Sequence, residues 1–347
     1  MTEGLDMDFV ESVWLPALAP LYDSWFRVDV TGTDNLPKGT AGLLVSNHSG
    51  NLPIDAFMVQ TAVYRASGRW SRVLAGDVAW TMPGISDIAR TIGAVRADPA
   101  AAHSLLRGGW LVSDFPEGYR GLGKPYSQRY ELQRFGRGGF AALALRHDVP
   151  IVPVAITGAE EIYPQLGSLL RGPATIGNNA ARTTGGQSEG AASFDEALAD
   201  LVYGLTDMIG TGARGPISEL PVFFLGAEGR KRREALTEML ADVARSAAKD
   251  LGIPYLPTTP FFPWLGPLGL VPLPSKWTID FLEPVDARQW AAQYRAEIME
   301  PVEAAEELTG EQLATDPVSV LGLADDVRGQ IHNQLLSRLR TRRSAFY

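Results

Sequence analysis

Between residues 42 and 156 the chain alternates short apolar segments with segments of helical periodicity. The apolar segments lie at 42–46, 72–75, 94–95, 110–113 and 150–156. The segments of helical periodicity lie at 53–64, 85–90, 99–106 and 139–146. Strands that alternate with helices are joined by crossover connections, which place them parallel in one sheet with helices over its faces. The sequence therefore predicts an α/β fold with a mostly parallel or mixed β-sheet covered by helices.

The residues before and after this alternating region are predicted to form separate parts of the chain. Residues 1–30 contain an apolar stretch, Phe9–Phe26, that Pro16 and Pro20 interrupt, which predicts short, broken helices in an N-terminal helical segment. Residues 31–166 form the predicted core. Residues 167–249 predict an insertion, because a small, polar, Gly-rich loop at 171–193 is followed by helical stretches at 195–209 and 230–250.

The C-terminal part of the chain returns to apolar sequence. Residues 250–300 contain a Pro-rich apolar run at 258–277 and a strand at 277–282, which we expect to rejoin the core. Residues 301–347 then predict an acidic linker near 303–316 and a basic, amphipathic C-terminal helix over 327–343.

The composition excludes several classes of site. The 347 residues include no Cys, which excludes thiol nucleophiles and Cys-ligated metal sites, and the four His argue against a His-rich metal centre, so no metal is expected. The net charge of −9 argues against nucleic-acid binding, which requires a broad basic surface. The acidic start of the chain predicts no signal peptide, and no run is apolar and long enough to span a membrane.

The first candidate for chemistry is the block Asn47–Asp55, which directly follows the apolar segment 42–46. His48 lies just past the carboxyl end of this predicted strand, where open α/β sheets place their sites. If the loop folds back over the next helix, Asp55 can accept one imidazole N–H and leave the other nitrogen as a general base. The alternative is structural: Asp55 only complements the helix dipole, and His48 only satisfies loop backbone.

The second candidate is the block Phe115–Arg120, which follows the predicted strand at 110–113. Glu117 and Arg120, held by a Pro-Gly turn at the same sheet edge as His48, suit an anion site. The next stretch contains a local excess of basic residues, namely Lys124, Arg129, Arg134 and Arg137. A solvated basic loop is the alternative interpretation.

The segment Gly118–Lys124 also has the spacing of a phosphate-binding loop, GxxxxGK, after a strand. The next residue is Pro125, where such a loop needs Ser or Thr to bind Mg²⁺. A nucleotide hydrolase is therefore the weakest of the functional hypotheses.

These blocks together resemble the glycerolipid acyltransferases, the family of the 1-acylglycerol-3-phosphate (lysophospholipid) acyltransferases. The resemblance rests on four blocks in the same order, which are His48…Asp55, Arg96 after Gly93-Ala94-Val95, Phe115-Pro116-Glu117-Gly118, and Val149-Pro150-Ile151-Val152-Pro153-Val154. It covers about 22–166, and again about 250–347, where LPSKWTIDFLEPV and the basic tail resemble bacterial members.

The resemblance implies a glycerol-phosphate acyltransferase-like fold and a role in phospholipid biosynthesis. The implied reaction moves a fatty acyl group from an acyl thioester, acyl-CoA or acyl carrier protein, to the hydroxyl of a lysophospholipid, with 1-acylglycerol-3-phosphate as the expected acceptor. No cofactor or covalent enzyme intermediate is implied.

The family's motifs also imply roles for individual residues. His48 would act as the general base and Asp55 would orient it. The implied acceptor-phosphate site consists of Arg96, Glu117, Gly118 and Arg120. The basic run suits the phosphates of coenzyme A or of an anionic lipid, with Lys124, Arg134 and Arg137 as contacts.

The sequence departs from the family pattern at three positions. Six residues separate His48 from Asp55, where four are commonest. Tyr119 stands where Ser or Thr is common, and Asp77 stands near the place of a frequent Lys.

A lipid substrate requires contact with a membrane, and we expect a cytoplasmic protein that associates peripherally with the cytoplasmic membrane. Two segments offer such a contact. The first is the apolar run at 258–277, and the second is the basic tail, in which Leu335, Leu336 and Leu339 lie beside Arg338, Arg340, Arg342 and Arg343. An apolar helix face also fits packing against a core, so this alternative stays open for the tail.

Two rival functions remain at this stage. The first keeps the fold without catalysis, as a lipid- or acyl-CoA-binding protein with a degraded His48–Asp55 pair. The second is the phosphate-loop nucleotide hydrolase suggested by Gly118–Lys124.

Overall fold

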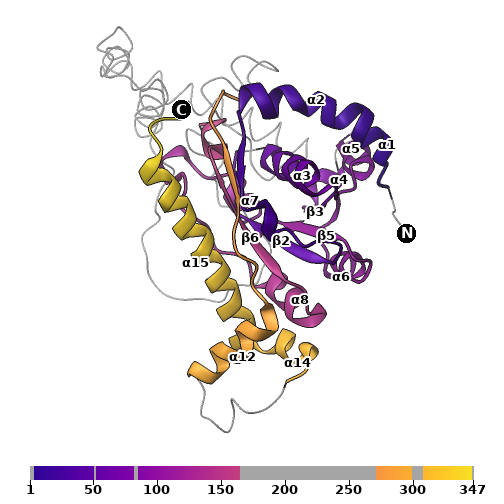
Figure 1. The fold of residues 1–347 in the computed structure, drawn as a ribbon, viewed down its shortest axis with the longest axis vertical. Coiled ribbons are helices and arrows are strands. Elements are labelled where there is room, and N and C mark those ends of the chain that lie inside the picture. Colours follow the sequence, from indigo (N-terminus) through magenta and orange to yellow (C-terminus); the bar gives the residue numbers. More distant parts are fainter. Residues whose placement is uncertain (1–3, 51, 82–84, 165–270, 299–307, 346–347) are drawn as a thin grey trace, which may run out of the picture. The chain divides into compact units, whose positions relative to one another are not determined.

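A computed structural model describes residues 4–50, 52–81, 85–164, 271–298 and 308–345 of the chain (Figure 1). These residues belong to two compact units. The first comprises Met1–Leu122, Tyr130–Ile162 and Pro274–Tyr347, and the second comprises Gly123–Arg129 and Tyr163–Leu273. The predicted insertion at 167–249 and the greater part of the apolar run at 258–277 lie outside the described residues.

The first unit is built on a seven-stranded sheet with the strand order β1-β7-β6-β2-β5-β3-β4. The strands are β1 (Asp29–Thr31), β2 (Gly42–Ser46), β3 (Arg72–Ala75), β4 (Val95–Arg96), β5 (Leu111–Asp114), β6 (Ile151–Thr157) and β7 (Thr278–Phe281). All neighbouring strands pair in parallel except β6 and β7, which are antiparallel. The predicted α/β fold with a mostly parallel, mixed sheet is confirmed, and β7 is the strand that returns from the C-terminal part.

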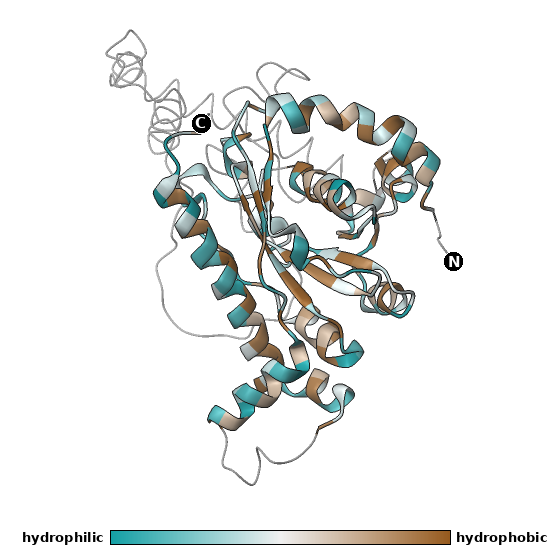
Figure 2. Ribbon diagram, viewed as in Figure 1, coloured by the Kyte–Doolittle hydropathy of each residue, from teal (hydrophilic) through white to brown (hydrophobic). Residues whose placement is uncertain are grey.

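Helices cover both faces of this sheet (Figure 1). The main apolar core lies between β2, β5 and β6 on one side and three helices on the other, α6 (Pro99–Arg107), α8 (Gly139–His147) and α15 (Pro317–Thr341). Figure 2 shows the strands as predominantly hydrophobic and α15 as a helix with many hydrophilic residues. The remaining helices are α3 (Ile54–Ser67), α4 (Val78–Thr81), α5 (Ile85–Thr91), α7 (Tyr119–Leu122), α12 (Ala287–Ile298) and α14 (Gly310–Thr315).

The N-terminal segment is continuous, whereas the sequence predicts short, broken helices. It runs through α1 (Met7–Phe9), η1 (Val10–Trp14), α2 (Leu15–Ala19) and η2 (Pro20–Trp25) without leaving the helical conformation. Pro16 and Pro20 each fall in the first two residues of one of these pieces, and η1 and η2 are turns of the wider π type. Both prolines therefore stand where α-helical and π-type turns adjoin, and the chain keeps helical backbone angles through each of these junctions.

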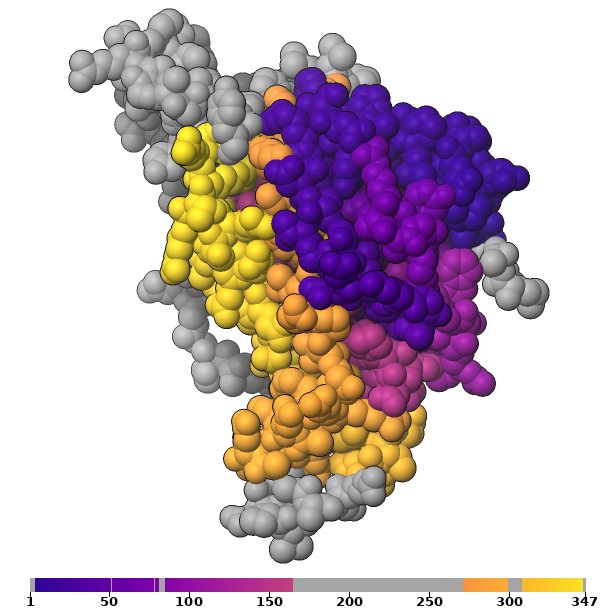
Figure 3. All heavy atoms as spheres, viewed as in Figure 1, coloured from indigo at the N-terminus to yellow at the C-terminus, as the bar shows by residue number. Residues whose placement is uncertain are grey.

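The C-terminal part contains more helix than the sequence predicts. The expected acidic linker near 303–316 includes α14, which begins with Thr309 and Gln312 in a capping box. The basic helix starts at Pro317, where Asp316 caps it, well before the expected residue 327. Figure 3 shows α15, in yellow, lying against the orange segment that contains β7 and α12.

The apolar face of α15 packs against the sheet, which agrees with the alternative interpretation of this helix as part of the core. Leu335 is fully buried in the main core and Leu339 packs against it, which leaves Leu336 as an exposed leucine. Two of the tail arginines are also engaged inside the unit: Arg338 pairs with Asp280 on β7, and Arg342 pairs with Glu161.

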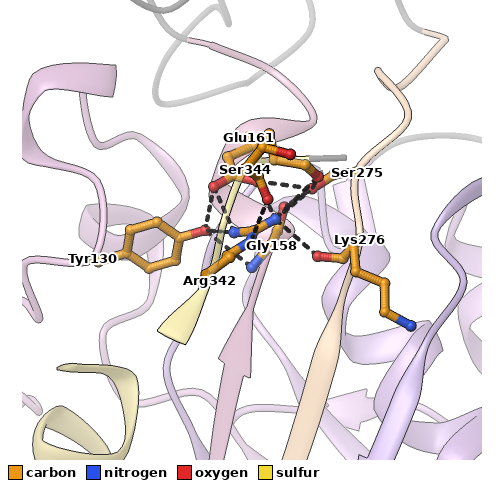
Figure 4. A network of polar contacts seen from close by, with 8 residues as sticks. Tyr130, Gly158, Glu161, Ser275, Lys276, Arg342 and Ser344 are labelled. Atoms are coloured by element: carbon orange, nitrogen blue, oxygen red, sulfur yellow. Dashed lines mark hydrogen bonds and ion pairs between the residues drawn. The ribbon is translucent and has the colours of Figure 1, made fainter. Parts of the chain in front are cut away.

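Arg342 lies at the centre of a polar network that joins the end of the chain to the loop after β6 (Figure 4). Its two terminal nitrogens donate to the two oxygens of Glu161, each at 2.6 Å. Glu161 also accepts from the Tyr130 hydroxyl at 2.7 Å and from the Ser275 hydroxyl at 2.8 Å. Burial and the neighbouring Glu161 carboxylate raise the pKa of Tyr130, so its hydroxyl remains a donor. The network holds four segments together that are distant in sequence.

Asp280 gives this fold a measurable dependence on pH. Burial acts to raise the pKa of this carboxyl, and hydrogen bonds from Arg338, Thr31 and Gln334 outweigh it, so the pKa lies below its ordinary value of 3.8. A carboxyl whose pKa is lower in the folded chain stabilises the fold above its unfolded pKa and loses that contribution as the pH falls through the folded pKa.

We therefore expect Asp280→Asn to lower the free energy of unfolding by about 2–3 kcal/mol at neutral pH. The difference in the free energy of unfolding between this variant and the wild type should shrink below about pH 4, where Asp280 becomes protonated first in the unfolded wild type. Urea unfolding followed by circular dichroism at a series of pH values measures both effects. Asp87→Asn, at a carboxyl that is 77% exposed, is the matched control and should leave stability nearly unchanged. A difference that stays constant down to pH 2 would contradict this account.

Candidate active site

The candidate site lies where β2 and β5 end, at the carboxyl edge of the parallel strands. Asn47 directly follows β2, and its side chain bonds both backbone groups of one residue of β6. Its amide nitrogen donates to the Ile156 carbonyl at 3.0 Å, and its oxygen accepts from the Ile156 N–H at 2.8 Å. This pair of bonds fixes the direction in which the chain leaves the sheet, immediately before His48.

His48 and Asp55 are in direct contact. His48 Nδ1 lies 2.7 Å from Asp55 Oδ2, and both residues are buried. Asp55 stands in the first turn of α3 and accepts two further hydrogen bonds, from the Ser49 and Ala56 backbone N–H groups, each at 2.8 Å. Because an ionised carboxylate only accepts, the contact assigns the imidazole proton to Nδ1 and leaves Nε2 as the nitrogen that can take a proton.

The six-residue separation is bridged by a loop that turns back on itself. Gly50 has φ +91°, in the left-handed region that favours glycine. A Cβ at this position would also lie 3.0 Å from the Ala159 carbonyl oxygen and 3.1 Å from Ile162 Cδ1. The loop therefore packs tightly on the segment after β6, which brings Ser49 and His48 back onto the start of α3.

Glu117 supports His48 from the neighbouring strand. Its side chain is buried, and one oxygen accepts from the His48 backbone N–H at 2.8 Å. The other oxygen accepts from the Gln133 backbone N–H at 2.6 Å. The sequence places Glu117 in an acceptor-phosphate site, and the contacts present in the structure hold the His48 backbone and the segment after it.

The turn after Glu117 also packs on His48. Gly118 has φ +54° and precedes the short helix α7. A Cβ on Gly121 would lie 2.6 Å from the His48 carbonyl oxygen, so only glycine fits there without a shift. The Phe115 ring lies 4.7 Å from the imidazole, centroid to centroid. This helical turn occupies the place where a phosphate-binding loop would need an open conformation, which argues against the nucleotide-hydrolase hypothesis.

The structure places the predicted basic residues on several different elements. Arg96 ends the edge strand β4 and is exposed, with Nε 3.4 Å from Asp77 Oδ1. Arg120 is exposed on α7, and Arg134 and Arg137 are exposed between α7 and α8. Lys124 belongs to the second unit, together with Arg129, whose guanidinium stacks 4.4 Å over the Tyr126 ring.

Two polar residues near His48 were not among the site residues predicted from the sequence. Asn47 fixes the start of the loop through its two bonds to Ile156. Asp114 ends β5, and burial raises the pKa of its carboxyl to about 6, against the opposing effects of the Phe115 N–H and of the charge on His48. Both are polar residues directly at the end of a buried apolar strand, which is the signal that could have identified them.

Within the described residues, no group of three or more His, Asp or Glu side chains is arranged to hold a metal ion. In the same part of the chain, no helix combines the length and the apolar character needed to cross a bilayer.

Comparisons with known proteins place this geometry in a family. Residues 27–157 match the family described as Acyltransferase. An uncharacterized protein of Mycobacterium tuberculosis is 34% identical over 346 residues, covering 99% of this chain and 70% of the relative. The human protein named "DGAT1/2-independent enzyme synthesizing storage lipids" is 27% identical over 154 residues, covering 43% of this chain and 47% of that protein.

Among solved structures, the crystal structure of the 1-acyl-sn-glycerophosphate (LPA) acyltransferase PlsC from Thermotoga maritima is similar to part of the chain. It is 21% identical, with a TM-score of 0.33, and the similarity covers 46% of this chain and 64% of that one. The resemblance to acyltransferases found in the sequence motifs is confirmed by the family match. The chain belongs to the acyltransferase family.

Proposed function

We propose that the protein transfers a fatty acyl group from an acyl thioester, either acyl-CoA or acyl carrier protein, to the hydroxyl of a lysophospholipid-type acceptor. The first acceptor to test is 1-acylglycerol-3-phosphate, which the sequence resemblance implies. The observation that carries this proposal is the 2.7 Å contact between His48 Nδ1 and Asp55 Oδ2, at a buried carboxylate that two backbone amides hold in place.

The proposed reaction needs only one proton carrier. His48 Nε2 removes the proton from the acceptor hydroxyl as its oxygen attacks the thioester carbonyl carbon. The tetrahedral intermediate then collapses with cleavage of the C–S bond, and His48 returns the proton to the departing thiolate. Asp55 stabilises the imidazolium between these steps. A positioned general base contributes about 10²- to 10⁴-fold, and holding both substrates together contributes further.

The rival proposal, a binding protein with a degraded pair, is motivated by the long spacing between His48 and Asp55. The folded-back loop at Gly50 and the three hydrogen bonds to Asp55 support the catalytic proposal instead. Reaching an acyl acceptor in a bilayer also requires association with a membrane surface, and we propose that this occurs peripherally, at the cytoplasmic membrane.

The direct test is the release of free thiol from oleoyl-CoA in the presence of lysophosphatidate, with the lipid product identified by mass spectrometry. We expect His48→Ala to lower kcat by at least about 10²-fold, because the acceptor hydroxyl loses its general base. His332→Ala, at a half-buried histidine of helix α15 to which the proposed reaction assigns no role, is the matched control and should keep wild-type activity. If His48→Ala releases thiol and forms product at the wild-type rate, the proposed mechanism is wrong.

Glu117→Gln tests whether the neighbouring strand positions the base. Glutamine has the same shape, but its amide NH₂ must face one of the two backbone N–H groups that donate hydrogen bonds to the carboxylate. Two donors then face each other, and one of the two hydrogen bonds is lost. We expect kcat to fall about 10-fold or more, and the free energy of unfolding to fall by about 1–3 kcal/mol.

The control for this experiment is Glu131→Gln, at an exposed glutamate in the same region. Steady-state kinetics and urea unfolding of the two variants are compared side by side. Equal behaviour of both variants would show that Glu117 does not position His48.

A further inference from the structure

The acidic residue Asp77 contacts Arg96, which the sequence resemblance assigns to the site for the acceptor's phosphate. Asp77 Oδ1 lies 3.4 Å from Arg96 Nε, and their side chains are 80% and 60% exposed. The backbone fixes this pairing: Arg96 lies directly opposite Ala75 in the β3–β4 register, and the Ala97 N–H donates to the Ala75 carbonyl at 2.8 Å. Asp77 follows Ala75 by two residues, so the sheet itself presents the two side chains together.

A chain of contacts links this pair to His48. The Tyr119 hydroxyl rests on Gly76, where an added Cβ would lie only 2.6 Å from it. Tyr119 begins α7, and Gly121 of the same helix packs against the His48 carbonyl oxygen. The side chain of Tyr119 thus connects the residue next to Asp77 with the turn that holds His48. Both lie at the edge of the sheet where the parallel strands β2, β5, β3 and β4 end.

The charge at this position is unsuited to a phosphate monoester. Such a group carries about −1.5 to −2 at neutral pH. Arg96 attracts such a group and the adjacent Asp77 repels it, and the ion pair carries no net charge. A headgroup without net charge avoids this repulsion, and an ammonium group in a zwitterionic headgroup can in addition pair with Asp77.

From this geometry we infer that Asp77 is a specificity-determining residue. It offsets the charge of Arg96 and shifts the preference for acceptors from phosphate monoesters toward headgroups that carry no net charge. This inference rests on the proposed function, because it requires that the acceptor headgroup lies at Arg96. Two kinds of lipid share the favoured chemistry, a zwitterionic lysophospholipid and an uncharged monoacylglycerol.

The experiment compares kcat/KM for three acceptors with one acyl chain: lysophosphatidate, lysophosphatidylethanolamine and monoacylglycerol. We expect Asp77→Asn to raise kcat/KM for lysophosphatidate, relative to monoacylglycerol, by about 3- to 10-fold, because an exposed like charge is removed at close range. The gain should diminish in high salt, where exposed charges are screened. A change in this ratio cannot come from altered folding alone, since both acceptors are measured on the same protein.

Two matched variants make the test specific. Asp87→Asn removes the same charge from another exposed Asp–Arg pair, Asp87 with Arg90 at 3.3 Å, and should leave the ratio unchanged. In the double variant Asp77→Asn/Arg96→Gln, the gain should disappear if Asp77 acts through Arg96. Lysophosphatidylethanolamine separates the two favoured lipids: an ammonium contact predicts that Asp77→Asn lowers its kcat/KM relative to monoacylglycerol, whereas charge balance alone leaves that ratio unchanged.

The outcomes distinguish this inference from the proposed function. If the wild type acylates none of the acceptors, the proposed function fails. If it acylates them and Asp77→Asn leaves the ratio of lysophosphatidate to monoacylglycerol unchanged, the inference about Asp77 is overturned while the proposed function stands.

Discussion

The candidate site depends on one buried carboxylate. Asp55 accepts from the His48 ring and from the Ser49 and Ala56 backbone amides, and each of these donors comes from a different part of the loop and helix. A carboxylate buried without such partners would be costly, so its burial and its hydrogen bonds require each other. The bond to the ring also assigns the imidazole proton to Nδ1, and the two backbone amides hold the carboxylate in place for it. The geometry of the loop and the chemistry of His48 therefore have a single physical origin.

Around this centre, buried acids connect segments that are far apart in sequence. Glu117 accepts from two backbone amides on either side of the site, and Glu161 receives Arg342 from the end of the chain. Asp280, on the antiparallel strand β7, does the same for Arg338 of α15. Each acid is satisfied by several donors, which is the condition under which buried charges are tolerated. The C-terminal helix is thereby an integral part of the unit that carries the site.

The sequence predicts the central sheet well and the termini less well, for a physical reason in each case. The strands at 42–46 and 72–75 are found at those residues, because short apolar runs between helical segments have few alternatives in an α/β fold. The sequence could offer the pairing of His48 with Asp55 only as a hypothesis, because it depends on the path of the loop between them. The positive φ of Gly50 is the feature that lets this loop turn back. The prediction of broken helices at the N-terminus was wrong because the energetic cost of a proline depends on its position in the helical turns, which the sequence pattern does not show. The contacts of Asn47, Glu161 and Asp280 join residues too distant in sequence for any local pattern to reveal.

The arginines show most clearly why a count of charges does not locate a binding site. The sequence offers Arg96 and the basic residues between α7 and α8 as candidates for phosphate contacts, and the arginines of the tail as candidates for contact with a membrane. In the structure, Arg338 and Arg342 pair with buried acids, and Arg96 faces Asp77. An arginine already paired with a carboxylate contributes less to binding an anion, because the ligand must compete with its partner or be repelled by it. Under the proposed function, we therefore expect the exposed side chains of Arg120, Arg134 and Arg137, rather than the paired Arg96, to meet the phosphates of an acyl donor.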